Sequence, residues 1–143
     1  MDNKYVLNFT IPFDLKCLYR VEEYVKNFFS LMNMDSKKYD MLLFRINLAL
    51  TEAVVNAIKH SEKYNDHDQI KIHMAFDGEN IIIKVHSKGK PFKVNNIKKP
   101  EPLSDSGRGL YVISCMMDKI DILNTGDENI LVMEKTLSNK QLK

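Results

Sequence analysis

The sequence predicts an α+β fold, a two-layer sandwich in which one mixed, mostly antiparallel sheet carries helices on one face. Several segments alternate apolar and polar residues, and two pairs of them are joined by short turns that contain glycine. Three further segments place apolar residues at helical spacing. The order strand, helix, helix, hairpin, loop, helix, hairpin favours one sheet with a separate helix layer.

The first two predicted elements are a strand and a helix. Residues 4–10 alternate apolar and polar side chains, which predicts a strand, and Pro12 is expected to end it. Asp14 is a candidate N-cap for a helix that reaches about Asn33. The apolar residues of this helix keep a helical period and are expected to face the core: Leu18, Val21, Val25, Phe28, Phe29 and Met32.

A longer helix is predicted from about Lys37 to His60, with one apolar stripe formed by Leu42, Leu43, Ile46, Leu50, Ala53 and Ala57. Glu52 and Asn56 lie one turn apart, so both side chains emerge on the same flank of this stripe, and His60 continues the row. One interpretation is a solvated helix flank. The other is a site for a hard metal and proton transfer, in which an amide oxygen binds magnesium and a carboxylate accepts a proton.

The chain then predicts a hairpin followed by a long loop. Gln69–Phe76 and Glu79–His86 are expected strands joined at Asp77-Gly78, and the second strand is expected to lie centrally because it is more continuously apolar. Residues 87–106 show no periodicity and contain several prolines, asparagines and lysines. A loop of this length inside a compact domain is typical of a lid or a binding loop.

The last part predicts a third helix and a second hairpin. Gly107-Arg108-Gly109 opens the helix, and Asp118 is expected to close it. Ile120–Leu123 and Ile130–Lys135 are expected strands that turn at Thr125-Gly126-Asp127, and the polar residues 138–143 are expected to form a frayed tail.

Composition predicts a single cytoplasmic domain over residues 1–143. The chain is 44% hydrophobic and 28% charged, and its net charge of +2 gives no reason to expect a nucleic-acid or membrane partner. Cys17 and Cys115 lack metal-ligand spacing and are expected to be buried free thiols in a reducing compartment. No signal-peptide pattern occurs, and no apolar run approaches the ~20 residues that span a bilayer.

The glycines on either side of Arg108 have a physical use at the start of a helix. A helix N-terminus presents unpaired N–H groups and a positive dipole end, and Gly107 and Gly109 would let a phosphate come close. The alternative is that these glycines only allow a tight turn. The presence of Glu52 and Asn56 elsewhere in the chain favours the phosphate interpretation, because a metal ligand and a phosphate-binding loop together make a magnesium–nucleotide site.

These motifs resemble a known family. Glu52 to His60 resembles the N-box of the gyrase, histidine-kinase and MutL ATPase superfamily, which has the Bergerat fold. Ser106 to Leu110, followed by Met116-Met117-Asp118, resembles the second glycine box of that superfamily. Short length and the Met-Met-Asp segment point to one branch, the bacterial anti-sigma-factor serine kinases. The resemblance runs from about residue 5 to residue 136.

The resemblance implies ATP and Mg²⁺ as cofactors and a role for each matching residue. Asn56 would coordinate magnesium, and Glu52 would be the catalytic base that takes the proton from a substrate serine. The phosphates would meet the segment that comprises Gly107, Arg108, Gly109 and Leu110. The loop from Lys93 to Ser106 would be the nucleotide lid, and Lys98 or Lys99 would swing toward the phosphates, although a solvated loop is the alternative for each lysine.

One part of the pattern departs from the family. The first glycine box should contain Asp-x-Gly, in which the aspartate accepts a hydrogen bond from the adenine amino group. Gly89 and Phe92 fit this box, but Ser87 stands where the aspartate belongs. Because charge-assisted hydrogen bonds are roughly twice as strong as neutral ones, the expected loss in nucleotide affinity is about 1–3 kcal/mol.

The resemblance also implies partners and leaves two functions open. The first is an active kinase that phosphorylates a STAS-type anti-sigma antagonist and binds a sigma factor in a partner switch, with a homodimer as its expected state. The second is a pseudo-kinase that acts as a protein-binding module. Glu52 and Asn56 favour the first and Ser87 favours the second, while an ATPase module detached from a histidine kinase is a weaker third. Arg20 matches an arginine of the partner surface in this branch, or is simply an exposed helix residue.

Overall fold

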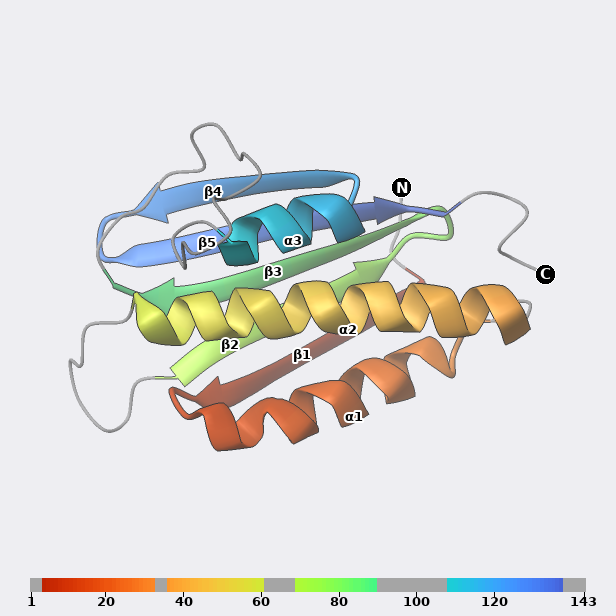
Figure 1. Ribbon diagram of the computed structural model, residues 1–143, viewed down its shortest axis with the longest axis horizontal. Coiled ribbons are helices and arrows are strands. Elements are labelled where there is room, and N and C mark those ends of the chain that lie inside the picture. The colour runs from red at the N-terminus through yellow and green to blue at the C-terminus, as the bar shows by residue number, and fades with distance from the viewer. Residues whose placement is uncertain (1–3, 33–35, 61–68, 90–107, 138–143) are drawn as a thin grey trace.

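The computed structural model describes residues 4–32, 36–60, 69–89 and 108–137. Five strands form one sheet: β1 (Tyr5–Pro12), β2 (Gln69–Phe76), β3 (Asn80–Lys88), β4 (Lys119–Thr125) and β5 (Glu128–Thr136). Three helices accompany them: α1 (Leu18–Phe29), α2 (Ser36–Lys59) and α3 (Arg108–Met116). All three helices lie on one face of the sheet (Figure 1). The predicted α+β sandwich is therefore confirmed.

The strand order is β1-β2-β3-β5-β4, and each of the four pairings is antiparallel. The strand predicted to be central, β3, does lie in the middle. Its inner residues Ile81, Ile83 and Val85 are buried, whereas Lys84 on the other face is exposed. This alternation fixes the register, because a slip of one residue would turn the apolar set toward solvent.

The first strand and the first helix differ in length from the prediction. The strand β1 runs to Pro12 and ends there, as predicted; a proline is tolerated at this position because β1 is an edge strand, where its missing N–H removes no hydrogen bond to a second neighbouring strand. Asp14 caps a short 3₁₀ turn (Leu15–Cys17) by accepting a hydrogen bond from the Lys16 amide at 2.9 Å. The helix α1 follows this turn and ends at Phe29, so it stops before the predicted end at Asn33.

The long helix α2 lies across the sheet between α1 and α3 (Figure 1). Five of the six residues of its predicted stripe are buried, with Ile46 and Leu50 fully enclosed, and Leu43 is partly buried against the core. A window of 18 residues within residues 37–59 has a mean hydropathy of 1.5, so this helix is long and apolar enough to cross a membrane, by length and composition only. Part of that hydropathy comes from the outward face, where Met41 is 60% exposed and Phe44 is 64% exposed.

The prediction that both cysteines are buried is wrong. Cys115 is exposed and Cys17 is partly exposed. Cys115 follows the buried Ile113 by two residues, and two residues turn a helix by about 200°, so its thiol points away from the core.

Candidate functional site

The first turn of α3 lies directly against the polar flank of α2. A Cβ atom added to Gly109 would lie 3.0 Å from Oε2 of Glu52 and 3.1 Å from both Oδ1 and Nδ2 of Asn56. Glu52 and Asn56 are themselves partly exposed. The fold thus brings together the two halves of the site that the sequence suggested, and it does so because the residue at 109 has no side chain.

The arrangement of Glu52 and Asn56 opposite the start of α3 suits a phosphate group that is bound together with a metal cation. Two oxygen-bearing side chains, Glu52 and Asn56, face the N-terminus of α3, which carries no acidic residue in its first turn. The described residues contain no cluster of three His, Cys, Asp or Glu side chains that would hold a metal alone. Magnesium does not require one, since it is usually held by one or two protein oxygens together with phosphate oxygens and water. The donor set therefore fits a magnesium-bound phosphate compound.

Two other predicted residues lie at the end of β3. Ser87 faces the helix layer and is 6% exposed. The amide of Gly89 donates a hydrogen bond to the Asp127 carbonyl at 3.2 Å, which fastens the chain after β3 to the turn between β4 and β5. The end of β3, the start of β5, the last turns of α2 and the first turn of α3 all lie on the same side of the molecule (Figure 1).

The remaining predicted site residues divide into three groups. Arg108 is the exposed first residue of α3, and Leu110 packs against the core with its side chain partly buried. His60, one residue beyond α2, is exposed. Phe92, Gly107 and the whole lid segment with Lys98 and Lys99 lie outside the described residues.

Arg20 lies apart from these residues, on α1. The helix α2 separates α1 from α3 (Figure 1). Arg20 is exposed, its Nε donates to the Tyr19 hydroxyl at 3.1 Å, and its guanidinium lies 5.8 Å from the centre of the Tyr19 ring. The hydrogen bond with Tyr19 raises the pKa of Arg20. The two side chains form an exposed basic and aromatic surface, of the composition that is enriched at protein interfaces.

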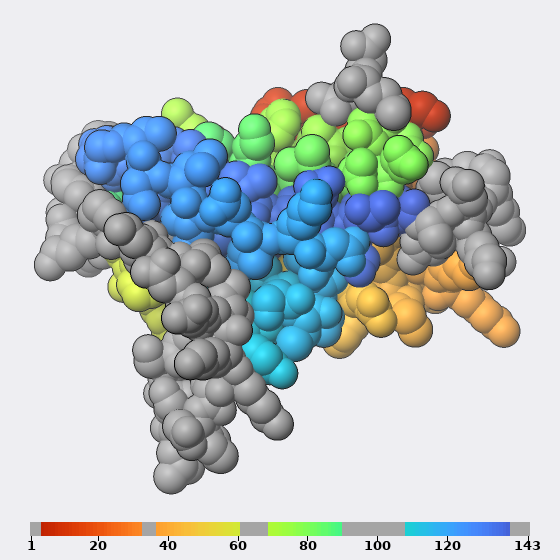
Figure 2. Space-filling model, turned by 90° about the horizontal axis from the view of Figure 1, so that it is seen from above, coloured from red at the N-terminus to blue at the C-terminus, as the bar shows by residue number. Residues whose placement is uncertain are grey.

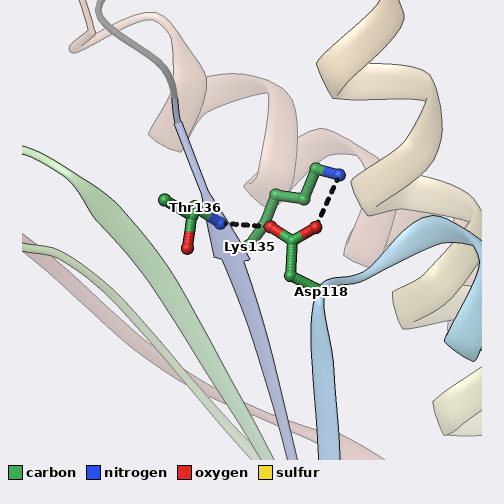
Figure 3. Close-up of polar contacts among 3 residues, drawn as sticks. All are labelled: Asp118, Lys135 and Thr136. Carbon is green, nitrogen blue, oxygen red and sulfur yellow. Dashed lines mark hydrogen bonds and ion pairs between the residues drawn. The ribbon is translucent and has the colours of Figure 1, made fainter.

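The C-terminal end of α3 is fastened to β5 by contacts that the sequence did not reveal. Asp118 accepts a hydrogen bond from the Thr136 amide at 2.7 Å and lies 3.5 Å from Nζ of Lys135 (Figure 3). The Asp118 amide also donates to the Glu134 carbonyl at 2.9 Å. Seen from above, α3 and β4 lie next to each other at the surface of this edge (Figure 2). These contacts hold α3 in a fixed position relative to the sheet.

A second residue that sequence reasoning missed is Asn129, which is 2% exposed and lies directly opposite Ser87 on β5. The prediction began this strand at Ile130, whereas β5 begins at Glu128. The available signal was the alternation itself, because Asn129, Leu131 and Met133 lie two residues apart and share one face.

Comparison with known proteins places these features in a wider context. The histidine kinase-like ATPase domain family matches residues 11–135. Serine-protein kinase RsbW of Bacillus cereus is 32% identical over 108 residues, which are 68% of this chain and 66% of that protein. Serine-protein kinase RsbW of Oceanobacillus iheyensis is 28% identical over 89 residues, which are 55% of this chain and 56% of that protein. The chain thus spans a little over half to about two thirds of these relatives.

A solved structure shares the fold. The RsbU and RsbW domains of Rv1364c from Mycobacterium tuberculosis align with a TM-score of 0.68 and 15% identity, over 92% of this chain and 32% of that one. Together with the matching relatives, this confirms the resemblance predicted from the two motifs.

Proposed function

The chain belongs to the histidine kinase-like ATPase domain family, and from this premise we propose that it is an ATP- and magnesium-dependent protein-serine kinase. The relatives that match it are named serine-protein kinases. We further propose that it acts as an anti-sigma factor: it phosphorylates a STAS-type antagonist and binds a sigma factor in a partner switch.

One observation carries the proposal, namely the contact of Gly109 with Glu52 and Asn56. A carboxamide that could bind magnesium, a carboxylate and the N-terminus of a helix meet at one point, and the proposed phosphoryl transfer would use all three. The reaction depends mainly on positioning and charge neutralisation, with little covalent chemistry from the protein.

Each residue has a role in this mechanism. Magnesium would neutralise phosphate charge, and the side-chain oxygen of Asn56 would hold it. The amides at the start of α3 orient the phosphates, and the positive end of the helix dipole favours their negative charge. Glu52 takes the proton of the substrate serine hydroxyl while that oxygen forms its bond to the terminal phosphorus and the bond to the leaving ADP breaks.

The partner surface of the proposal lies on α1. Arg20 and Tyr19 form an exposed surface on the opposite side of α2 from α3, so a partner can bind there without entering the space between α2 and α3. The substrate serine must nevertheless reach Glu52, because a general base acts only within hydrogen-bond distance. We also propose that the protein is cytoplasmic and forms a homodimer.

The test is calorimetric titration with Mg²⁺–ATP, followed by phosphate transfer to a purified STAS-type antagonist. Asn56→Ala should weaken binding of the magnesium nucleotide at least about tenfold, because a metal ligand is lost. Glu52→Ala should abolish transfer while binding changes less than threefold. Thr51→Ala is the matched control, since Thr51 lies on the same helix next to Glu52 but outside the row that Glu52 and Asn56 form.

Two results would refute parts of this proposal. Full transfer by Glu52→Ala would exclude Glu52 as the base, and unchanged magnesium–nucleotide affinity in Asn56→Ala would exclude Asn56 as the metal ligand. Binding of nucleotide without transfer by the wild type would instead identify a pseudo-kinase that acts as a protein-binding module, the function that Ser87 favours.

A further inference from the structure

The face of the sheet opposite the helices carries a group of basic side chains on its two inner strands β2 and β3. The helices α1, α2 and α3 all cover the other face (Figure 1). Lys71 lies directly opposite His86, and His73 lies directly opposite Lys84. These residues alternate along both strands with buried apolar or small residues that face the helices. Opposed Cβ atoms on neighbouring strands lie about 5 Å apart, and residues two apart on a strand lie about 7 Å apart, so the four basic side chains occupy the corners of one small rectangle.

The four side chains line an open hollow of about 590 Å³, to which β1 contributes Asn8 and Thr10. We call it the basic hollow. No acidic side chain is among the described residues that line it. A volume of this order suits a small ligand. Like charges that face each other across strands are destabilising, so a bound anion would relieve a repulsion that the sheet otherwise carries.

Both imidazole rings of the hollow are held through Nδ1. His73 Nδ1 lies 2.6 Å from Oδ1 of Asn8, and His86 Nδ1 lies 2.7 Å from Oε1 of Glu128. Because a carboxamide oxygen and a carboxylate oxygen can only accept hydrogen bonds, Nδ1 is the donor in both contacts. The other nitrogen, Nε2, is therefore the one that gains the proton when the ring becomes charged. Each histidine thus adds a donor and a positive charge to the hollow as the pH falls.

The charges around the two histidines are mainly positive. The charged or titratable side chains next to them are Lys71 on β2, Lys84 and Lys88 on β3, and Glu128 on β5. Glu128 contacts His86, and the residues that β1 contributes are uncharged. Burial, followed by the charges of Lys84 and His86, lowers the pKa of His73. An anion bound among these side chains would act in the opposite direction and raise the pKa of His73.

We infer that the basic hollow is a second ligand site, on the opposite face of the sheet from the proposed nucleotide site, and that it binds a phosphate-bearing anion. The ammonium groups of Lys71 and Lys84 match the two negative charges of a phosphate near neutral pH, and lysine is a common phosphate ligand. A single carboxylate carries half that charge. The Thr10 hydroxyl and the amino group of the Asn8 carboxamide add neutral donors. The inference does not rest on the proposed function, because the two sites share no residue.

The test is an NMR titration that follows the ring signals of His73 and His86 while inorganic phosphate or pyrophosphate is added, without magnesium or nucleotide. Both sets of signals should shift and saturate in the millimolar range or below. Changing Lys71→Gln and Lys84→Gln together should weaken binding at least about tenfold, because two charge-assisted contacts are lost. Lys26→Gln is the matched control, since it removes the same charge from an exposed position on α1 and should leave the affinity unchanged.

A second arm uses sulfate, which stays a dianion while the histidines titrate. Sulfate affinity should rise at least about threefold as the pH falls from about 8 to about 5, because the two rings become charged over this range. His73→Asn keeps a polar side chain beside Asn8 but cannot become charged, so it should lose part of this rise.

Three results would overturn the inference, and each leaves the proposed function standing. The first is a wild type whose His73 and His86 signals do not respond to phosphate or pyrophosphate. The second is unchanged affinity in the variant that lacks both lysines. The third is binding of an oligoglutamate peptide at these signals without binding of either phosphate compound, which would identify a surface for acidic protein segments instead.

Discussion

Gly109→Ala should weaken nucleotide binding while leaving the stability of the protein nearly unchanged. The new methyl group would lie 3.0 Å from Glu52 Oε2 and 3.1 Å from the two terminal atoms of Asn56, whereas ordinary contacts begin at 3.4 Å. Both side chains must therefore move by about 0.4 Å or rotate away. In a helix, alanine is more favourable than glycine by about 1 kcal/mol, and a side chain forced off its rotamer costs about 0.5–1.5 kcal/mol.

These terms nearly cancel in stability but not in function. The free energy of unfolding should change by less than about 1 kcal/mol, as measured by urea denaturation. Magnesium–nucleotide binding and transfer should fall by about tenfold to 100-fold, because a site must be held within about 0.5 Å of its working geometry. Ser114→Ala is the matched control, since it also introduces alanine into α3, and the Ser114 hydroxyl donates to the Tyr111 carbonyl of the same helix at 2.6 Å. Binding by Gly109→Ala within twofold of wild type would refute the reasoning.

Two further predictions concern stability. Asp118→Ala should lower the free energy of unfolding, measured by urea denaturation, by about 1–3 kcal/mol. The Thr136 amide loses its acceptor, and Lys135, which is 9% exposed, loses its charge partner. Adding Lys135→Met to this variant should recover part of the lost stability, because the unpaired charge is then removed. Burial, followed by the charges of Lys84 and His86, lowers the pKa of His73 from its usual 6.5, so the unfolded chain takes up a proton more readily than the folded one. Stability should therefore fall as the pH drops below about 6.5, and His73→Asn should reduce that fall; an unchanged pH profile in the variant would contradict the assignment.

The local patterns predicted most of the fold, because each depends on neighbours within a few residues. The more continuously apolar sequence of β3 predicted its central place. The turn at Asp77-Gly78 formed as expected, with Gly78 at a φ of +101° and Asp77 accepting hydrogen bonds from the amides of Glu79 and Asn80. The row of Glu52 and Asn56 followed from helical spacing alone. Each of these features is decided by the chain's own periodicity and turn chemistry.

The features that escaped prediction depend on register between distant segments. Asn129 becomes opposite to Ser87 only once β5 pairs antiparallel with β3, and no pattern within either strand specifies that pairing. The meeting of Gly109 with Glu52 and Asn56 was predicted from the motifs, but the placement of α3 that produces it depends on how the chain after α3 is fastened to β5 through Asp118. The exposure of Cys115 depends on which side of α3 meets the core, and a short helix that is apolar on several sides leaves this undecided.

The altered end of β3 and the preserved contact at Gly109 need not point to different functions, because they act on different steps. Groups that hold the purine base contact it equally in the ground state and in the transition state, so a serine at position 87 in place of aspartate would weaken binding and raise KM without changing the chemical step. In the proposed mechanism, Glu52 acts where the proton moves during transfer, so it would govern kcat, whereas Asn56 would hold the magnesium nucleotide in the ground state as well. A kinase with Ser87 therefore keeps its rate at saturating nucleotide, and Ser87→Asp should lower the KM for ATP by about tenfold to 100-fold while kcat stays within about twofold. A rise in kcat of tenfold or more in that variant would show instead that Ser87 slows the chemical step as well as weakening nucleotide binding, and would refute this separation of the two effects.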